Sequence, residues 1–563
     1  MTFFSLPSRL PLALTVFCIS ILFLPTIVAQ GPSDVPPASS FLRRATARAV
    51  VIGDYLYIDG GEVSQLDSRG TKHVESFRNS SAVNSTLSIN LSQSWSSSTV
   101  SIRTIPKSPM TMTGQALWNH DGVLYIWGGH VPNFLPYALG PPASWKFTTD
   151  GRGGGSWSED TPNNPTEFNE LLRSEDGSYV TTPSAAFWVG GVTGPTIHDT
   201  DTALERHLVP GLVSFNFTTK SWKSETTTGI FSANGTLQRG SAQYVPPFGP
   251  NGLVMLLGGT RGPERVPSHY LGFQNVTFFD PVTRAWYWQM TTGNAPTMRT
   301  FLCAAGVAGK NGTYEIFVFG GLSEQDKPYD DVFILSLPAF TWTTVPYAPK
   351  NRRYLHSCVV GGKRQMLVVG GLGDEHWDTL TPDPWPQGLG IFDMTDLEWK
   401  TEYNANAEDY ETPSTVKTWY DQNALESVEW SSPQVKELFL PGTPKDDPNN
   451  DPKDDPNNDP KDDPNNDPKD EKTTPVGAIV GGVVGGVAAI ALAGAVFWFM
   501  RRRKRRATPR TGYPPDQADS KTTPFHVSTH QPEHHYQSVE LSSPVEVQAD
   551  VPGGRGHRAE LSG

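Results

Sequence analysis

Short apolar runs separated by turn residues fill the chain between about residues 41 and 443. The runs are rich in β-branched and aromatic residues, and glycine, proline, asparagine and aspartate stand between them. This pattern predicts many short β-strands rather than helices. Six of the runs end in a glycine doublet, which marks an internal repeat.

The repeat has a second fixed feature, a tryptophan that follows each doublet. The doublets are Gly60-Gly61, Gly128-Gly129, Gly190-Gly191, Gly258-Gly259, Gly320-Gly321 and Gly370-Gly371. The tryptophans are Trp95, Trp157, Trp222, Trp286, Trp342 and Trp399, and successive ones lie 56 to 65 residues apart. A period of this length is typical of an array of similar structural units.

Each unit contains a strand, a turn, a strand that ends in the doublet, a variable loop, a third strand, a tight turn and a strand that begins at the tryptophan. Four antiparallel strands per repeat are typical of the blade of a β-propeller. Glycine permits a positive φ and a close backbone approach where the second strand leaves the sheet. We expect the tryptophan to fill the thin core between neighbouring blades.

The doublet, its spacing and the tryptophan resemble the kelch repeat over residues 41–443, and the whole-chain layout resembles that of membrane-anchored kelch-repeat proteins of filamentous fungi. The resemblance implies an all-β kelch-type β-propeller of six four-stranded blades, with seven blades as the alternative. Two repeats depart from the pattern: the turn before Trp95 is one residue short, and Gly151–Ser156 is an insertion.

The segment after Trp399 is expected to close or cover the propeller. Residues 412–421 predict a short helix with Thr412 as its cap, Pro413 at the first position and Val416, Trp419 and Tyr420 on one face. Residues 433–440 have the pattern of a final strand or a short helix, and both interpretations stay open.

Both ends of the chain carry apolar stretches of a different kind. Residues 1–29 have the pattern of a secretory signal peptide. Residues 476–500 contain no charge and are long enough for a transmembrane helix, and six basic residues follow at 501–506. Together they predict a single-pass type I membrane protein, at the cell surface or in the secretory pathway, with its N-terminus outside. The small residues Gly477, Gly481 and Gly485 predict a homodimer through this helix.

Residues 444–474 form a spacer built on the repeated octad KDDPNNDP. Without apolar residues it cannot form a core, so we expect a disordered, extended stalk. Residues 501–563 are expected to form a disordered cytoplasmic tail. The formal net charge of the whole chain, -13, argues against nucleic acid as a partner.

Seven sequons of the Asn-x-Ser/Thr type precede residue 476, and they predict a glycoprotein. They are Asn79, Asn84, Asn90, Asn216, Asn234, Asn275 and Asn311. Only three cysteines are present, Cys18, Cys303 and Cys358, so at most one disulfide forms outside the N-terminal segment. Whether Cys303 and Cys358 pair or remain buried thiols stays open.

Galactose oxidase shares the kelch-type propeller, and its copper radical site requires an adjacent Tyr-His pair. No such pair precedes the predicted span, and Tyr354 and His356 are separated by Leu355. We therefore predict no enzyme, no catalytic or metal-binding residue and no cofactor. The alternative is a secretory-pathway propeller enzyme, a carbohydrate oxidoreductase or hydrolase, with a non-standard site.

The long loops after the doublets are the candidates for function, because in kelch domains they form a face that binds partners. Arginine, tryptophan and tyrosine are typical of binding hot spots. The candidate residues are Arg261, Arg265, His269, Tyr270, Asp374, His376, Trp377 and Trp385. The sequence thus predicts a cell-surface glycoprotein that binds an extracellular protein or glycan, with the cell wall as one location.

Overall fold

The computed structural model describes residues 32–441 apart from 68, 72–78, 133–142, 195–205, 264, 347–350, 374–378 and 423–424. The predicted signal peptide, stalk, transmembrane helix and tail lie outside the described residues. Within the described part of the chain, no helix is long and apolar enough to cross a membrane.

Besides three smaller sheets of two or three strands, the described residues contain six main sheets, each with four antiparallel strands that come from one repeat. Their strands are β2 (Arg48–Ile52), β3 (Tyr55–Asp59), β6 (Ser85–Asn90) and β8 (Ile102–Pro106) in sheet 1; β9 (Ala116–His120), β10 (Val123–Trp127), β11 (Trp145–Thr149) and β12 (Gly155–Glu159) in sheet 2; β13 (Ser178–Thr181), β14 (Ala185–Val189), β17 (Leu212–Asn216) and β18 (Ser221–Glu225) in sheet 3; β19 (Ser241–Val245), β20 (Leu253–Leu257), β21 (Asn275–Phe279) and β22 (Trp286–Met290) in sheet 4; β24 (Cys303–Ala308), β25 (Tyr314–Phe319), β26 (Val332–Leu337) and β27 (Thr341–Thr344) in sheet 5; and β28 (Ser357–Gly361), β29 (Gln365–Val369), β30 (Leu389–Asp393) and β31 (Glu398–Lys400) in sheet 6. Sheet 5 gains a fifth strand, β23 (Thr292–Gly293), parallel to β27.

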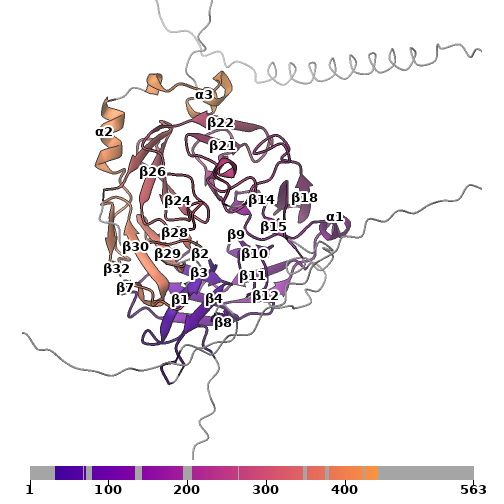
Figure 1. Ribbon diagram of the computed structural model, residues 1–563, viewed down its shortest axis with the longest axis vertical. Helices are drawn as coiled ribbons and strands as arrows, with labels where there is room; N and C mark the ends of the chain where they lie inside the picture. The colour runs from indigo at the N-terminus through magenta and orange to yellow at the C-terminus, as the bar shows by residue number, and fades with distance from the viewer. Residues whose placement is uncertain are drawn as a thin grey trace, which may run out of the picture. The chain divides into compact units, whose positions relative to one another are not determined.

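The first strand of every sheet is its innermost strand (Figure 1). These strands contact one another in a closed cycle, β2, β9, β13, β19, β24, β28 and again β2. The six sheets are therefore arranged around one axis, and the last sheet packs against the first. The all-β prediction is confirmed, and each glycine doublet directly follows the second strand of its sheet.

The glycine doublets join each sheet to the next. The second glycine of every doublet donates its backbone N–H to a carbonyl oxygen just before the first strand of the following sheet, at 2.7 to 3.0 Å. The six pairs are Gly61–Met112, Gly129–Ser174, Gly191–Leu237, Gly259–Arg299, Gly321–Arg353 and Gly371–Arg44, which form a closed cycle. All twelve glycines have a positive φ, as the sequence analysis expected.

The cores lie between neighbouring sheets, and each contains one repeat tryptophan at its centre or edge. Trp157 packs with residues of sheets 1 and 2, Trp222 with sheets 2 and 3, and Trp342 with sheets 4 and 5. Trp286 packs against the cluster between sheets 3 and 4, and Trp399 packs against the cluster between sheets 5 and 6. The predicted role of the tryptophans as inter-sheet core residues is thus observed.

Trp95 is the exception, and its predicted place at the start of a fourth strand is wrong. It lies in the two-residue strand β7 (Trp95–Ser96), which pairs with β32 (Glu402–Tyr403), while β8 forms the fourth strand of sheet 1. The Trp95 ring stacks on Tyr403 with centroids 5.2 Å apart. The shortened turn before Trp95 releases this residue from the sheet, and the pair joins the chain after sheet 6 to sheet 1.

The N-terminal segment also contacts sheet 6. Strand β1 (Phe41–Ala45) pairs with β4 (Glu62–Gln65), which pairs with β5 (Ser81–Ala82). From β1, the Arg43 Nε donates to the Thr381 carbonyl at 2.8 Å, and the Leu42 carbonyl accepts from the Asp383 N–H at 2.8 Å. Ring closure therefore uses both ends of the repeat region.

The segment after sheet 6 is helical. Helix α2 (Ser414–Gln422) buries Val416, and α3 (Pro433–Phe439) buries Val435 and Phe439 against sheets 4 and 5. For residues 433–440 the sequence predicts either a final strand or a short helix. The structure shows the helix, and it does not close the ring. The remaining elements are α1 (Pro165–Asn169), β15 (Val192–Thr193), β16 (His207–Leu208), η2 (Pro267–His269), η3 (Pro386–Gly388) and η4 (Leu425–Ser427).

Candidate functional site: the central cavity and the loop face

A cavity of about 390 Å³ lies among the innermost strands of the six sheets. Its walls are largely small or apolar residues, and a few polar side chains project among them. The polar residues that matter for chemistry are Arg48, Tyr179, Gln243, His356 and Ser357, together with Cys303 and Cys358. No motif in the sequence singles out Arg48, Tyr179 or Gln243. Their shared position on the first strand of a repeat was the available signal.

Arg48 is the only charged side chain among the lining residues that the structure describes. Its Nε donates a 2.8 Å hydrogen bond to the Gln115 carbonyl, and its guanidinium carbon lies 5.2 Å from the centroid of the Tyr179 ring. The arginine therefore extends from sheet 1 toward sheet 3. A cation without a carboxylate among these lining residues gives the cavity a positive potential.

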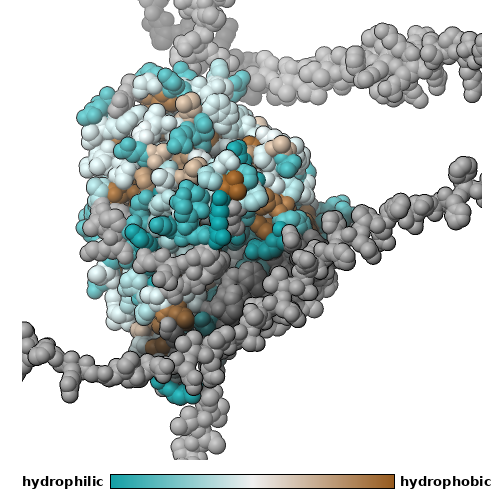
Figure 2. Space-filling view, viewed as in Figure 1, coloured by the Kyte–Doolittle hydropathy of each residue, from teal (hydrophilic) through white to brown (hydrophobic). Residues whose placement is uncertain are grey.

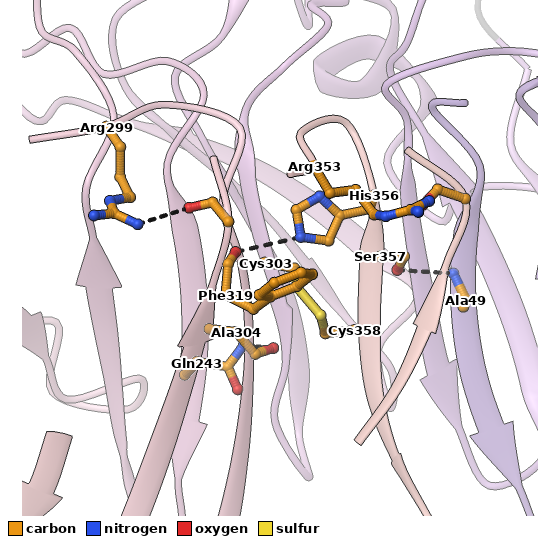
Figure 3. The surroundings of a disulfide bond; sticks show 12 residues. Ala49, Gln243, Arg299, Cys303, Ala304, Phe319, Arg353, His356, Ser357 and Cys358 are labelled. Atoms are coloured by element: carbon orange, nitrogen blue, oxygen red, sulfur yellow. Dashed lines mark hydrogen bonds between the residues drawn. A yellow bond between two sulfur atoms is a disulfide. The ribbon is translucent and has the colours of Figure 1, made fainter. Parts of the chain in front are cut away.

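Cys303 and Cys358 form a disulfide on the cavity wall, with their Cα atoms 5.5 Å apart (Figure 3). The pairing that the sequence left open is thus settled in favour of a bond between β24 and β28. These cysteines lie at the starts of neighbouring innermost strands. A disulfide here links sheets 5 and 6 covalently.

His356 lies next to the disulfide and is buried. Its Nε2 is 3.3 Å from the Phe319 carbonyl oxygen (Figure 3). Burial, followed by the positive charge of Arg353, lowers the pKa of His356 to about 3. The imidazole is therefore neutral at physiological pH, and it adds no charge to the cavity.

Two further arginines near the cavity form hydrogen bonds and ion pairs within the fold. Arg353 donates to the Gly370 carbonyl at 2.8 Å and forms a bidentate pair with Asp383, and neither side chain is exposed. Arg299 makes the equivalent bonds to the Gly320 carbonyl and Asp331. The partners of each arginine lie on the sheet whose first strand follows it, so the two side chains hold the segments before β24 and β28 against the ends of their own sheets.

Arg261 and Arg265 are exposed on the loop after the doublet of sheet 4. Arg261 Nη2 donates to the Ser268 carbonyl at 2.9 Å, and Arg265 Nη2 lies 2.6 Å from Asp326 Oδ2 in the corresponding loop of sheet 5. His269 is partly buried, with Nδ1 3.1 Å from the Pro263 carbonyl. Both arginines therefore lie on the loop of sheet 4, and Arg265 connects this loop to the corresponding loop of sheet 5.

Two further candidate binding residues pack into the fold. Tyr270 is only 6% exposed, so its side chain offers little surface to a partner. Trp385 is partly buried, and its ring lies against Trp399 and under the Arg353 guanidinium, which is 4.0 Å from the ring centroid. The bulky side chains pack because their loops fold back onto the sheet ends. Asp374, His376 and Trp377 lie outside the described residues.

None of the seven sequon asparagines is buried. Asn84, Asn234, Asn275 and Asn311 are exposed, and Asn79, Asn90 and Asn216 are partly exposed. The surface seen in Figure 2 is mainly hydrophilic, and its hydrophobic residues form small separate patches. A polar partner would meet charged and hydroxyl groups on this surface rather than a broad apolar face.

Comparisons with known proteins agree with this architecture. Residues 249–412 match the model of the KLHDC2/KLHL20/DRC7 Kelch-repeats domain. The chain is also 24% identical over 422 residues to a Kelch repeat-containing protein of Arthroderma benhamiae. That alignment covers 67% of this chain and 58% of the relative, so it spans little more than half of the relative's length.

The two matches support the kelch family, and they agree with the repeat pattern and the ring of sheets. A kelch-repeat domain indicates a propeller of the type used in protein interaction. The fold and the comparisons therefore describe an all-β chain that is similar to kelch-repeat proteins.

Proposed function

We propose that this chain is a six-bladed kelch propeller that binds an extracellular protein or glycan through the loops after its glycine doublets. In this proposal each of the six sheets is a blade, and the protein is not an enzyme. The partner carries acidic or hydroxyl groups at the contact, because the described loop of sheet 4 presents two arginines to solvent.

The observation that carries the proposal is the ion pair between Arg265 and Asp326. It joins the loops of two neighbouring sheets at 2.6 Å, while the Arg265 side chain stays 65% exposed. The Arg261 guanidinium donates to two backbone carbonyls. One is that of Ser268 in its own loop, and the other is that of Phe231 in the segment between β18 and β19. A surface whose cations are already held in place loses less conformational entropy on binding, which favours recognition.

The proposed location is the cell surface, with the propeller outside. The sequence features that support it are the signal-peptide pattern at 1–29 and the uncharged stretch 476–500. The Cys303–Cys358 disulfide also favours an oxidising compartment. The exposure of four sequon asparagines suits glycosylation. We further propose homodimer formation through Gly477, Gly481 and Gly485.

A binding screen against glycans and surface proteins tests the function. The purified full-length protein should bind a restricted set of polar or acidic partners, and Arg261→Ala together with Arg265→Ala should weaken that binding about tenfold or more, as expected when about 1.4 kcal/mol or more of binding energy is lost.

Arg152→Ala is the matched control for this screen. Arg152 is exposed in the turn between β11 and β12, at the opposite end of the sheets from the loops after the doublets. Its replacement removes the same charge and should leave binding unchanged. Equal losses in the two variants would mean that net charge, and not the loop face, determines binding.

Treatment with an N-glycosidase should separately reduce the apparent mass of the secreted protein, and an unchanged mass would contradict the proposed glycoprotein.

A further inference from the structure

Cys303, His356 and Cys358 form a compact group of metal-ligating side chains on the wall of the central cavity. One ligand atom from each residue, the two Sγ atoms and an imidazole nitrogen, lies within 4.8 Å of the other two. In a tetrahedral zinc site, bonds of about 2.3 Å to sulfur and about 2.0 Å to nitrogen place neighbouring ligand atoms roughly 3.5–3.8 Å apart. The three ligand atoms therefore converge on one point, and once the S–S bond is broken the two sulfur atoms need only move apart to reach the spacing that one zinc ion requires.

The backbone explains why these ligands converge. His356 and Cys358 are two residues apart at the start of β28, and alternate residues of an extended segment project to the same side. Cys303 begins β24, the innermost strand of sheet 5, which contacts β28. The ligands thus come from two sheets, and a bound ion would link them as the disulfide does.

The surroundings allow an open coordination position. All three residues line the cavity of about 390 Å³, which leaves space for a water molecule or a small ligand beside them. The Phe319 carbonyl, 3.3 Å from His356 Nε2, holds the imidazole from behind. Two thiolates and one Zn²⁺ have no net charge together, so the nearby cation Arg48 does not oppose the ion.

We propose that Cys303, His356 and Cys358 form a redox-gated zinc site, closed by the disulfide when oxidised and able to bind one Zn²⁺ when reduced. Opening the site requires a dithiol or phosphine reductant, which supplies two electrons to break the S–S bond. A dithiol transfers its own two protons to the sulfur atoms and becomes a disulfide, whereas a phosphine takes the oxygen atom of one water molecule, whose two protons complete the thiols, and becomes a phosphine oxide. Zinc then displaces the two thiol protons and takes the imidazole nitrogen as its third ligand.

Co²⁺ is the spectroscopic probe for this site in the full-length protein, because thiolate-bound tetrahedral Co²⁺ absorbs in characteristic charge-transfer and visible bands. The oxidised protein should show no such bands. After reduction with a phosphine and its removal, one equivalent of Co²⁺ should produce them, and Zn²⁺ should displace the Co²⁺ and abolish them. Reoxidation of the protein should release the metal.

Three variants test the ligand assignment. Cys303→Ser and Cys358→Ser should abolish the thiolate bands, and His356→Gln should weaken Co²⁺ binding by more than the roughly 10- to 100-fold that loss of an outer-shell partner costs. Tyr179→Phe, on another part of the cavity wall, should bind Co²⁺ as the unchanged protein does. The only other cysteine is Cys18 in the predicted signal peptide, so it cannot supply the bands once that peptide is removed.

Two results would overturn the proposal. One is a reduced protein that keeps its circular dichroism spectrum but shows no thiolate–Co²⁺ bands. The other is loss of the folded spectrum on reduction whether or not Zn²⁺ is present, because the ligands would then no longer be held together.

Discussion

The backbone N–H of Gly371 donates a 2.7 Å hydrogen bond to the carbonyl oxygen of Arg44, and this bond joins the last sheet of the ring to the first. The same contact recurs at the five other junctions between sheets. At the first glycine of each doublet, an added Cβ atom would lie within 2.9 Å of the accepting carbonyl oxygen. A Cβ atom at Gly370, for example, would be 2.6 Å from the Arg44 oxygen. The glycine doublet of each repeat therefore joins its sheet to the next one.

Gly190→Ala should destabilise the ring severely. The added Cβ would lie 1.9 Å from the Leu237 carbonyl oxygen, which is the acceptor for the Gly191 N–H. We expect a loss of about 3 kcal/mol or more in the free energy of unfolding, measured by urea denaturation.

Gly312→Ala is the control for backbone strain. Gly312 also has a positive φ, +75° against +67° at Gly190, but a Cβ there would meet nothing within 4 Å. It should cost only about 1–2 kcal/mol. Equal losses at the two positions would show that strain alone, and not the inter-sheet contact, explains the doublet.

The Trp95–Tyr403 pair should stabilise ring closure measurably. Their rings stack with centroids 5.2 Å apart, and the Tyr403 hydroxyl donates to the Leu91 carbonyl at 3.0 Å. A double-mutant cycle with Trp95→Ala and Tyr403→Ala should give a coupling energy of about 0.5–1.5 kcal/mol. Tyr403→Phe keeps the ring and loses the hydrogen bond, so it should cost about 1 kcal/mol. Strictly additive single and double variants would contradict the coupling.

Removing the disulfide should lower stability without removing the fold. The bond closes a loop with a sequence separation of 55 residues, for which the chain-entropy model gives about 4 kcal/mol. The Cys303→Ala, Cys358→Ala double variant should therefore unfold at a lower urea concentration with a similar dependence on urea. Thiol titration of the unfolded parent protein without reductant should find neither cysteine reactive. Two reactive thiols at this step would contradict the pairing.

Glu315 should make the stability of the protein depend on pH. Its carboxylate is buried, and it accepts hydrogen bonds from Tyr410 at 3.2 Å and Ser336 at 3.3 Å. Burial raises the pKa of Glu315 above its usual value near 4.5. The folded state therefore holds the proton more tightly than the unfolded state does. The stability that this group provides is complete below the unfolded pKa and decreases as pH rises through that value toward the higher folded pKa.

Glu315→Gln removes this titration, since an amide stays neutral at every pH. The difference in free energy of unfolding between the variant and the parent should shift in favour of the variant as pH rises above about 4.5. Urea denaturation at several pH values measures it. A difference that stays constant with pH would show that Glu315 does not contribute to the pH dependence.

The repeating part of the fold could be predicted from the sequence because its determinants are local. Each glycine doublet marks the end of a second strand, and Trp222 or Trp342 marks a fourth strand near its start. The prediction that Trp95 begins a fourth strand was wrong. The turn before it is one residue shorter, so Trp95 lies in β7, and its partner Tyr403 is remote in sequence.

The candidate site was less predictable because it depends on which strands become neighbours. Cys303 and Cys358 pair only because β24 and β28 are adjacent innermost strands. Likewise Tyr270 looks like a surface residue in its polar loop, but the loop turns its ring inward. Arg48 carries no motif, and only the cyclic arrangement places it in the cavity.

Ring closure also has a consequence for synthesis of the chain. Hydrogen bonds from the N-terminal strands β1 and β2 to the sheet 6 repeat span very large sequence separations, 308 residues for Ala49–Ser357 and 338 for Arg43–Thr381. Because the ribosome makes the chain from its N-terminus, the contacts of sheet 1 with sheet 6 cannot form until most of the domain has been synthesised. Contacts this distant are expected to form slowly and leave apolar surface uncovered meanwhile. Newly made chains should therefore depend on a chaperone until residue 403 has been synthesised and can pair with Trp95.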